Sequence, residues 1–350
     1  MTIEVLVTAL ATFLLALILT GVARAFALSH GVLDVPNDRS SHSTPTPRGG
    51  GSAIVASTIA AASVLWWRGV LDTPLYLALC GGGLAVAAVG FLDDRRPLPA
   101  GARLTAHVAA ALWALFCLGG LPALCIGQWT VHFGWAGYVL GVLGIGWTLN
   151  LFNFMDGIDG IAAAEGAFIA WGATLLAVAA GGACSGVCAM GLVVGAACCG
   201  FLRWNWPPAK IFMGDVGSGF IGYLIAVLAI ASARENATAL LVWLILGGVF
   251  FSDASVTLVR RSLRGERVHE AHRTHAYQWL ARRWGSHRSV TSAVLIINLA
   301  WLLPCAAVAS FYPRLAMWMV VAALAPIVLL ALIAGAGRGA PEALQEAKHS

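Results

Sequence analysis

The chain has 350 residues, of which 59% are hydrophobic and only 11% are charged (21 Lys and Arg, 16 Asp and Glu). Soluble domains carry about 25% charged residues. So few polar side chains cannot cover a water-facing surface of this size, which excludes a soluble globular protein and a disordered one. The net charge of +5 comes without a basic stripe interleaved with aromatic residues, so nucleic acid is not expected as a partner. The composition therefore predicts an integral membrane protein.

Long apolar stretches follow one another along most of the chain. A helix needs about 20 apolar residues to cross the hydrocarbon core of a membrane. The sequence predicts an all-α polytopic bundle of about eleven transmembrane helices, at 3–27, 50–67, 74–92, 104–120, 135–152, 161–180, 184–202, 217–233, 238–259, 290–311 and 315–335. Residues 1–335 would form a single polytopic transmembrane domain, and 336–350 a short cytoplasmic tail.

The basic residues predict the orientation of these spans. No Lys or Arg precedes Arg24 near the end of the first span, which predicts an outward N-terminus and, with eleven spans, a cytoplasmic C-terminus. On this topology 18 of the 21 Lys and Arg residues lie inside, and Arg68, Arg234 and Arg314 lie outside. Five inside loops then carry nearly all of the unusual residues.

The first inside loop, 34–51, is kept non-helical by its prolines and glycines. Arg48 stands beside three glycines, 49–51, where backbone amides and a cation could receive an anion. An ordinary flexible loop is the alternative.

The second inside loop begins with two adjacent carboxylates, Asp93 and Asp94, at the inner end of the third span. Carboxylates at membrane depth are usually functional. The C-terminus of a helix disfavours negative charge, so these acids are not expected to be capping residues. The alternative is a solvated turn that Arg95 and Arg96 neutralise.

In the third inside loop, Asn150, Asn153 and Asp156 are spaced by three, so they can share one helical face. Their carboxylate and amide oxygens suit a hard cation such as Mg²⁺. Asp-Gly steps beginning at Asp156 and Asp159 predict a break between the fifth and sixth spans, and such irregular backbone is tolerated at membrane depth where it lines a cavity. A polar helix hairpin is the alternative.

The fourth inside loop carries Lys210 and ends in Asp215, which a Gly/Ser turn follows at the start of the eighth span. The N-terminus of a helix with small residues is a ready site for an anion. Asp215 could also hold Mg²⁺ that bridges to a phosphate. Capping of the helix by Asp215 or Ser218 is compatible with either role.

The fifth inside loop, 260–288, is the longest and most basic, and it contains His269, His272 and His275. Together with Arg273, the last two histidines suggest a cluster that grips phosphates. A zinc site is one alternative, although the spacing supplies no closing pair of ligands. Contact with anionic lipids is another.

Outside the inner loops, the sequence offers two weaker features. Residues 128–133 alternate like a small strand in the outer loop 121–134. The eight cysteines include no CxxC pair and are interpreted as small hydrophobic residues, with a Cys125–Cys184 disulfide as the minor alternative.

The motifs together describe a cytoplasm-facing site with several carboxylates, Mg²⁺, phosphate-gripping cations and a wall of membrane. Such a site suits phosphoryl transfer between a soluble diphosphate and a lipid. The absence of a Walker A sequence argues against nucleotide-driven pumping. An ion-coupled transporter is the alternative from another class, but its acids would lie near the midplane, often on inverted repeats.

Between about residues 36 and 288 the sequence resembles the polyprenyl-phosphate N-acetylhexosamine-1-phosphate transferases of glycosyltransferase family 4. The matching motifs occur in the family's order: Asp93-Asp94, Asn150-x-x-Asn153-x-x-Asp156-Gly-x-Asp159-Gly, Phe212-Met-Gly-Asp215-x-Gly-Ser218 and a His-rich last inside loop. The first inside loop, with Pro36-Asn37-x-Arg39-x-x-His42, looks like that of the O-antigen-initiating branch.

The resemblance implies a multi-pass enzyme of the bacterial inner membrane whose active site faces the cytoplasm. It would transfer a sugar-1-phosphate from a UDP-N-acetyl sugar to undecaprenyl phosphate and release UMP, with Mg²⁺ or Mn²⁺, among membrane lipids and as a homodimer. The implied catalytic residues are Asp93, Asp94, Asp156 and Asp159, and the implied metal ligands are Asn153 and Asp215. Residues expected to bind substrate are Arg48, Asn150, Lys210, His272, Arg273 and His275.

The last loop departs from the family pattern, because Tyr277 and Gln278 stand where the GlcNAc-loading branch has further histidines. Only Arg273 and His275 match there, so the sugar could be GlcNAc, FucNAc or QuiNAc. Transfer of phospho-MurNAc-pentapeptide is the alternative within the family. A CDP-alcohol phosphotransferase is disfavoured, since its signature would need an arginine after Asp156-Gly157, where the sequence continues to Asp159-Gly-Ile-Ala.

Overall fold

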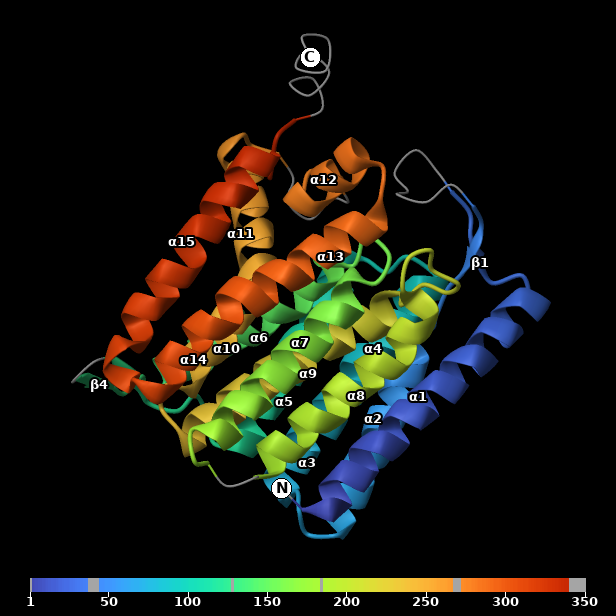
Figure 1. The fold of residues 1–350 in the computed structure, drawn as a ribbon. Coiled ribbons are helices and arrows are strands. Elements are labelled where there is room, and N and C mark those ends of the chain that lie inside the picture. The colour runs from blue at the N-terminus through green and yellow to red at the C-terminus, as the bar shows by residue number, and fades with distance from the viewer. Residues whose placement is uncertain (1, 37–43, 127–128, 183–184, 267–271, 340–350) are drawn as a thin grey trace.

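A computed structural model describes residues 2–36, 44–126, 129–182, 185–266 and 272–339, which form a bundle of helices (Figure 1). The helices are α1 (Ile3–Ser29), α2 (Gly51–Trp67), α3 (Thr73–Leu77), α4 (Gly83–Arg95), α5 (Ala100–Leu118), α6 (Ala136–Met155), α7 (Ile161–Ala179), α8 (Gly186–Asn205), α9 (Asp215–Glu235), α10 (Ala239–Leu246), α11 (Gly248–Leu263), α12 (Ala276–Trp284), α13 (His287–Ile297), α14 (Leu303–Phe311) and α15 (Ala316–Ala334). Short π-helical segments, η1 (Ala78–Gly82) and η2 (Asn298–Leu302), join α3 to α4 and α13 to α14, and the 3₁₀ turn η3 (Pro313–Leu315) precedes α15.

The prediction of an all-α polytopic membrane protein is confirmed. Within the described ranges, nine helical stretches are long and apolar enough to cross a membrane, and the pair α10–α11, bent by 72°, makes a tenth broken span. Helix α2 is equally apolar but has 17 residues. The expected number of eleven is reached when α2 and the bent pair are each counted as one span.

Helix α9 occupies the core of the bundle. Its residues 216–231 are all buried, and it packs against α6, α4 and α2. A helix that is hydrophobic all round is expected in such an interior position. By contrast, α1 and α15 expose large apolar side chains, such as Leu10 at 60% and Leu329 at 57%, as lipid-facing helices do. Both lie at the periphery of the bundle (Figure 1).

Glycines allow the neighbouring helices to approach the N-terminus of α9 closely. A Cβ atom on Gly51 of α2 would lie 2.4 Å from the Cα of Gly217, and one on Gly90 of α4 would lie 2.6 Å from the carbonyl of Asp215. Small residues at helix contacts are typical of packing in lipid. The close contacts place the C-terminal end of α4 directly beside the start of α9.

Two small hairpins complete the described structure. Strand β1 (Leu33–Asp34) pairs antiparallel with β2 (Thr46–Pro47), and β3 (Leu124–Ile126) pairs antiparallel with β4 (Trp129–Val131). A strand is thereby present within the stretch 128–133 whose alternation predicts one, and the predicted break between the fifth and sixth spans falls between α6 and α7. The Cys125–Cys184 alternative, and the motif residues Asn37, Arg39, His42 and His269, lie outside the residues whose side chains the structure describes.

The loops with the unusual residues gather at one end of the bundle, where β1 and α12 also lie, while the chain begins at the other end (Figure 1). This arrangement follows from the chain path, because α4 and α6 run toward that end and α7 and α9 run away from it.

Candidate active site

Asp94 lies at the centre of the site, between two elements far apart in the sequence. Its Oδ1 lies 2.6 Å from a guanidinium nitrogen of Arg48 and accepts the backbone N–H of Asp215 at 2.9 Å. Its Oδ2 accepts the N–H of Val216 at 3.3 Å. Asp94 therefore caps the N-terminus of α9 from outside that helix, which is where negative charge is favoured.

This arrangement corrects two expectations. The expectation that the acids at the end of α4 are not capping residues is wrong for Asp94, because Asp94 caps a different helix, α9. The N-terminus of α9 was expected to receive an external anion, but the Asp94 carboxylate already occupies its first two amides. Gly214 makes room for it: its φ is +74°, and a Cβ there would lie 2.4 Å from Asp94 Oδ2.

The three glycines beside Arg48 also differ from their expected role. The N–H groups of Gly50 and Gly51 donate to the carbonyls of Phe212 and Met213, each at 2.9 Å, and are not available to an anion. The segment is thus fastened to the loop that leads into α9. Its effect is to hold Arg48 against Asp94 and 3.6 Å from Asp215 Oδ1.

Asp93 faces a different partner. Its Oδ2 lies 2.6 Å from Nη1 of Arg103 on α5, and its Oδ1 accepts the N–H of Leu98 at 2.6 Å. The side chain of Asp93 is also hydrogen-bonded to the side chain of Asp215, so both adjacent aspartates contact the start of α9. Asp94 is committed to the start of α9, while Asp93 fixes an arginine at the start of α5.

A cavity of about 220 Å³ opens between α4, α5, α6 and α9. Its polar lining includes Asp93, Arg103, His107, Asn150, Asn153 and Asp215. Its other walls are apolar side chains of membrane-spanning helices, among them Val86, Leu104 and Leu149. The cavity therefore combines a charged mouth with a hydrophobic interior, which suits the phosphate end of a lipid.

The predicted face of α6 is present in part. Asn150 and Asn153 both line the cavity, and the amide of Asn153 donates to Ser218 Oγ at 3.4 Å. The amide of Asn150 donates to the carbonyl of Gly146 at 2.7 Å. Asp156 lies just beyond α6, as its C-cap. Desolvation, with repulsion from Asp215 and Asp94, raises the pKa of the Asp156 carboxyl well above its usual value.

The donor set fits a hard divalent cation. Asp93, Asp94, Asp156 and Asp215 converge on one end of the bundle, where Asp94 and Asp215 lie close enough to repel the Asp156 carboxylate. Oxygen ligands of this kind are what Mg²⁺ prefers. Among the described residues no three His, Cys, Asp or Glu side chains form a preformed metal-binding group, so substrate oxygens and Asn153 would have to complete a coordination shell.

A second, larger pocket of about 650 Å³ adjoins this cluster. Two of its lining residues are close in sequence to the cluster: Asp159 comes three residues after Asp156, and Phe212 comes three residues before Asp215. The pocket also contains the basic side chains Arg273, Arg282, His287 and Arg288. Asp159 is held by the N–H of Ala209 at 3.0 Å and lies 3.2 Å from His287 Nδ1. Three arginines in one open pocket are suited to a diphosphate.

The two described histidines of the fifth loop, His272 and His275, form a stacked group rather than an exposed phosphate grip. The rings of His272 and His275 lie 4.9 Å apart, and both lie within 6.4 Å of Phe154. His275 is 2% exposed and its Nδ1 lies 3.3 Å from Oδ1 of Asp253. Burial, with the neighbouring His275 and Arg261, lowers the pKa of His272 to about 3. His272 is therefore neutral at pH 7, unlike a phosphate-gripping cation.

Tyr277 and Gln278, the departures from the family pattern, have structural contacts. The Tyr277 hydroxyl donates to the carbonyl of Phe154 at 2.9 Å and packs against Gly157. Gln278 accepts the N–H of His275 and also lines the arginine pocket. Tyr277 thus ties α12 to the loop that carries Asp156.

Several contributors were missed by the sequence analysis. Arg103 and His107 are one helical turn apart on α5, a spacing that could have shown a polar face at the start of the fourth span. Asp253, a lone carboxylate in the apolar stretch 238–259, receives the N–H groups of Ala276 and Tyr277 at 2.9 and 3.0 Å. Lys210 was expected to bind substrate, but its exposed side chain lies over the Trp204 ring, 5.9 Å from the centroid, and lines neither pocket.

The fold and the site define a multi-pass membrane protein with an acidic cluster at one end of its helices. The model of glycosyl transferase family 4 matches residues 76–233, which contain Asp93 to Asp215 of this cluster. A probable undecaprenyl-phosphate N-acetylglucosaminyl 1-phosphate transferase of Bacillus subtilis is 30% identical over 306 residues, covering 85% of this chain and 82% of the relative. The chain belongs to this family, as the motifs predict.

Other relatives show the range of the family. A decaprenyl-phosphate N-acetylglucosaminephosphotransferase of Mycobacterium tuberculosis is 30% identical over 315 residues, covering 80% of this chain and 76% of the relative. A phospho-N-acetylmuramoyl-pentapeptide-transferase of Shouchella clausii is 31% identical over 269 residues, covering 72% and 80%.

Proposed function

We propose that this chain transfers N-acetylhexosamine-1-phosphate from a UDP-sugar to undecaprenyl phosphate, giving undecaprenyl-diphosphate-sugar and UMP. The observation that carries the proposal is the carboxylate cluster between two unlike pockets. One pocket has apolar walls of membrane-spanning helices and a charged mouth, and the other is open and lined by three arginines. A lipid phosphate and a soluble diphosphate are the substrates that match these two pockets. The names of the relatives support a polyprenyl-phosphate acceptor.

The reaction needs little proton transfer. A phosphate monoester has a second pKa of about 6, so the lipid phosphate is mostly a dianion at neutral pH. Its oxygen attacks the β-phosphorus of the UDP-sugar, the new P–O bond forms, and the bond to the UMP oxygen breaks. Asp93 already accepts hydrogen bonds from Arg103 and Leu98. We therefore infer that Asp93 orients the lipid phosphate through Arg103 more than it takes a proton.

The main barrier is the repulsion between two anions. Arg103 would hold the lipid phosphate at the mouth of the cavity, with His107 beside it as a neutral hydrogen-bonding group, and Arg273 and Arg282 would hold the diphosphate of the donor. Asp215 and Asn153 would hold Mg²⁺, or Mn²⁺ in its place, with Asp156 nearby. The ion, when bound, neutralises the diphosphate and stabilises the departing UMP.

The direct test is release of UMP by the purified protein. We expect UMP from UDP-GlcNAc only when undecaprenyl phosphate and Mg²⁺ are both present, with loss of activity on chelation and recovery on adding Mg²⁺. A transporter that uses the same acids would release no UMP. Release that does not depend on the lipid phosphate would contradict the proposed acceptor.

The identity of the transferred sugar is tested by comparing UDP-sugar donors. It is open because Tyr277 and Gln278 stand where the GlcNAc-loading branch has further histidines. UDP-GlcNAc, UDP-FucNAc and UDP-QuiNAc should be compared at equal concentration with undecaprenyl phosphate. UDP-MurNAc-pentapeptide belongs in the same series, because phospho-N-acetylmuramoyl-pentapeptide-transferases are also relatives. We expect a UDP-N-acetyl sugar without the peptide to be preferred, as in initiation of O-antigen or another cell-envelope polysaccharide.

The proposed setting is the inner membrane of a bacterium, with the acidic end of the bundle in the cytoplasm. The basic residues support it, because Arg48, Arg103, Arg273 and Arg282 all lie at that end, whereas Arg68 and Arg234 lie at the ends of α2 and α9 remote from it. Labelling of single cysteines placed at residues 68 and 282 in intact cells tests this orientation. Position 68 should react with an impermeant reagent and position 282 should not.

A further inference from the structure

A pocket of about 710 Å³ lies at the end of the bundle opposite to the carboxylate cluster. It is enclosed by the C-terminal ends of α7 and α9, the start of α8, α10 and the end of α14. Because α9 runs for 21 residues from Asp215 to Glu235, the two sites are about 30 Å apart. The proposed transferase reaction makes no use of this pocket.

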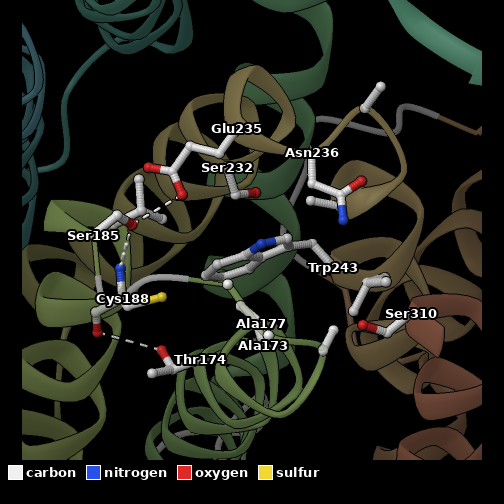
Figure 2. Close-up of a pocket in the computed structure, with 17 residues that line it drawn as sticks. Ala173, Thr174, Ala177, Ser185, Cys188, Ser232, Glu235, Asn236, Trp243 and Ser310 are labelled. Carbon is white, nitrogen blue, oxygen red and sulfur yellow. Dashed lines mark hydrogen bonds between the residues drawn. The ribbon is translucent and has the colours of Figure 1, made fainter. Parts of the chain in front are cut away.

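The lining of this pocket consists mostly of small apolar residues, with several polar side chains and negative charge only among the described residues. Its hydrogen-bonding side chains are Thr174, Ser185, Ser232, Glu235, Asn236, Trp243 and Ser310. Figure 2 shows the Trp243 indole lying across the pocket, with Glu235 and Ser232 on one side and Ser310 on another. Among the described residues that line it, Glu235 is the single charged one.

Glu235 is exposed at the mouth of the pocket, and no basic side chain among the described lining residues pairs with it. Its Oε2 accepts a hydrogen bond from Ser185 Oγ at 2.9 Å. The other charged group that acts on it is Asp72, a second carboxylate. The neighbouring Arg234 is directed elsewhere, since its guanidinium lies 3.5 Å from where a Cβ of Gly119 would be. Glu235 also ends α9, and negative charge is disfavoured at the C-terminus of a helix.

We propose that this pocket binds a primary ammonium group, held between the Glu235 carboxylate and the face of Trp243. An ammonium supplies a positive charge and three N–H donors, for which the carboxylate and the surrounding hydroxyls are acceptors. The aromatic face adds a cation–π contact. A quaternary ammonium has no N–H donor, and an anionic headgroup would be repelled, so both should bind less well.

The ammonium could belong to the ethanolamine headgroup of a membrane lipid or to a small soluble amine. The pocket lies at the ends of membrane-spanning helices, within reach of lipid headgroups. The two sources share the same chemistry at Glu235, and the experiment below separates them.

The test uses the full chain purified in detergent and mixed with equal amounts of phosphatidylethanolamine, phosphatidylcholine and phosphatidylglycerol of identical acyl chains. Native mass spectrometry measures which lipids stay bound. We expect the ethanolamine lipid to be retained about tenfold over the other two. Glu235→Gln should abolish the preference, and Trp243→Leu should reduce it. Glu4→Gln, which removes a carboxylate near the start of α1 that pairs with Arg68, should leave it unchanged.

A second arm identifies the source of the ammonium. If free ethanolamine at millimolar concentration raises the melting temperature of the wild type but not of Glu235→Gln, while no lipid is preferred, the ligand is a soluble amine. The proposal is overturned if no lipid is preferred and ethanolamine does not stabilise the protein. It is also overturned if the lipid preference survives in Glu235→Gln. UMP release should be unchanged in Glu235→Gln, which shows that the variant is folded.

Discussion

The two ends of helix α9 treat negative charge in opposite ways. At the N-terminus, Asp215 belongs to a group of four carboxylates, and the neighbouring Asp94 is bound by Arg48 and by two helix amides. At the C-terminus, Glu235 accepts a hydrogen bond from the hydroxyl of Ser185 and has another carboxylate, Asp72, as its charged neighbour. The helix dipole stabilises anions at the first end and destabilises them at the second.

The comparison teaches what distinguishes a reaction site from a binding site in this bundle. At the acidic end, Arg48 pairs with Asp94 and Arg103 pairs with Asp93. Adding or removing a substrate phosphate or a metal would therefore change the charge balance of several connected ion pairs. The pocket at the opposite end has one carboxylate and no cation among the described residues that line it. We propose that it binds a cation, and it has no counterpart of the network around Asp94 and Asp215.

Among variants that test the difference between the two ends of α9, Asp94→Ala is expected to have the largest effect on stability and activity. The change removes the partner of Arg48 and the cap of α9 together, which should lower the free energy of unfolding by about 2 kcal/mol. UMP release should fall by at least about 100-fold, because the start of α9 positions Asp215. Thermal unfolding and the transferase assay measure both. Asp94→Asn keeps an acceptor for the amides, so it should regain part of the stability but not the activity.

A smaller effect is expected from Arg103→Ala at the mouth of the lipid cavity. Loss of a charge-assisted contact should raise the KM for undecaprenyl phosphate by roughly tenfold, with the KM for the UDP-sugar unchanged. Arg103→Lys should restore part of the affinity, because lysine keeps the charge without the forked geometry. An equal rise in both KM values would show that Arg103 does not belong to the acceptor side.

Tyr277→Phe removes only the hydroxyl that bonds to the carbonyl of Phe154. One lost hydrogen bond is worth about 1 kcal/mol, so kcat/KM should fall by roughly fivefold. The fold should persist, because the ring remains packed. An unchanged kcat/KM with every donor would mean that the tie between α12 and the Asp156 loop has no part in catalysis.

The smallest effect at neutral pH is expected from His272→Gln. The folded protein lowers the pKa of His272 to about 3, so this ring is neutral in the folded state above that pH. The variant should leave the pH profile of UMP release unchanged between pH 6 and 8. Because the unfolded chain binds the proton more readily, His272 destabilises the fold as pH falls from its ordinary pKa near 6.5 toward 3. The melting temperature of the variant should fall less steeply over that range.

Much of this account could be predicted from the sequence, since it depends on composition and local spacing. The low content of charged residues predicts the bundle, and the Asp-Gly steps at 156–160 predict the break between α6 and α7. The spacing of Asn150 and Asn153 predicts a shared face, and both line one cavity. These features are properties of single segments, so no long-range contact was needed to find them.

The rest depends on contacts between distant segments. Asp94 was judged against the end of α4, but it caps α9, more than 120 residues later. The amides of Gly50 and Gly51 were expected to be free for an anion, but they pair with the loop before α9. Asp253 gave no local motif, although it holds the start of α12. The periodicity of hydrophobic residues within one helix does not predict which other helix its terminal side chains will contact.

The most direct measurement compares Asp215→Asn with Glu235→Gln, the two ends of one helix, in the assay of UMP release with Mg²⁺ titrated. Asp215→Asn should lose at least about 100-fold of the activity and require more Mg²⁺ for what remains, while Glu235→Gln should match the wild type. Activity and Mg²⁺ dependence that survive in Asp215→Asn would contradict the assignment of the acidic end as the site of phosphoryl transfer.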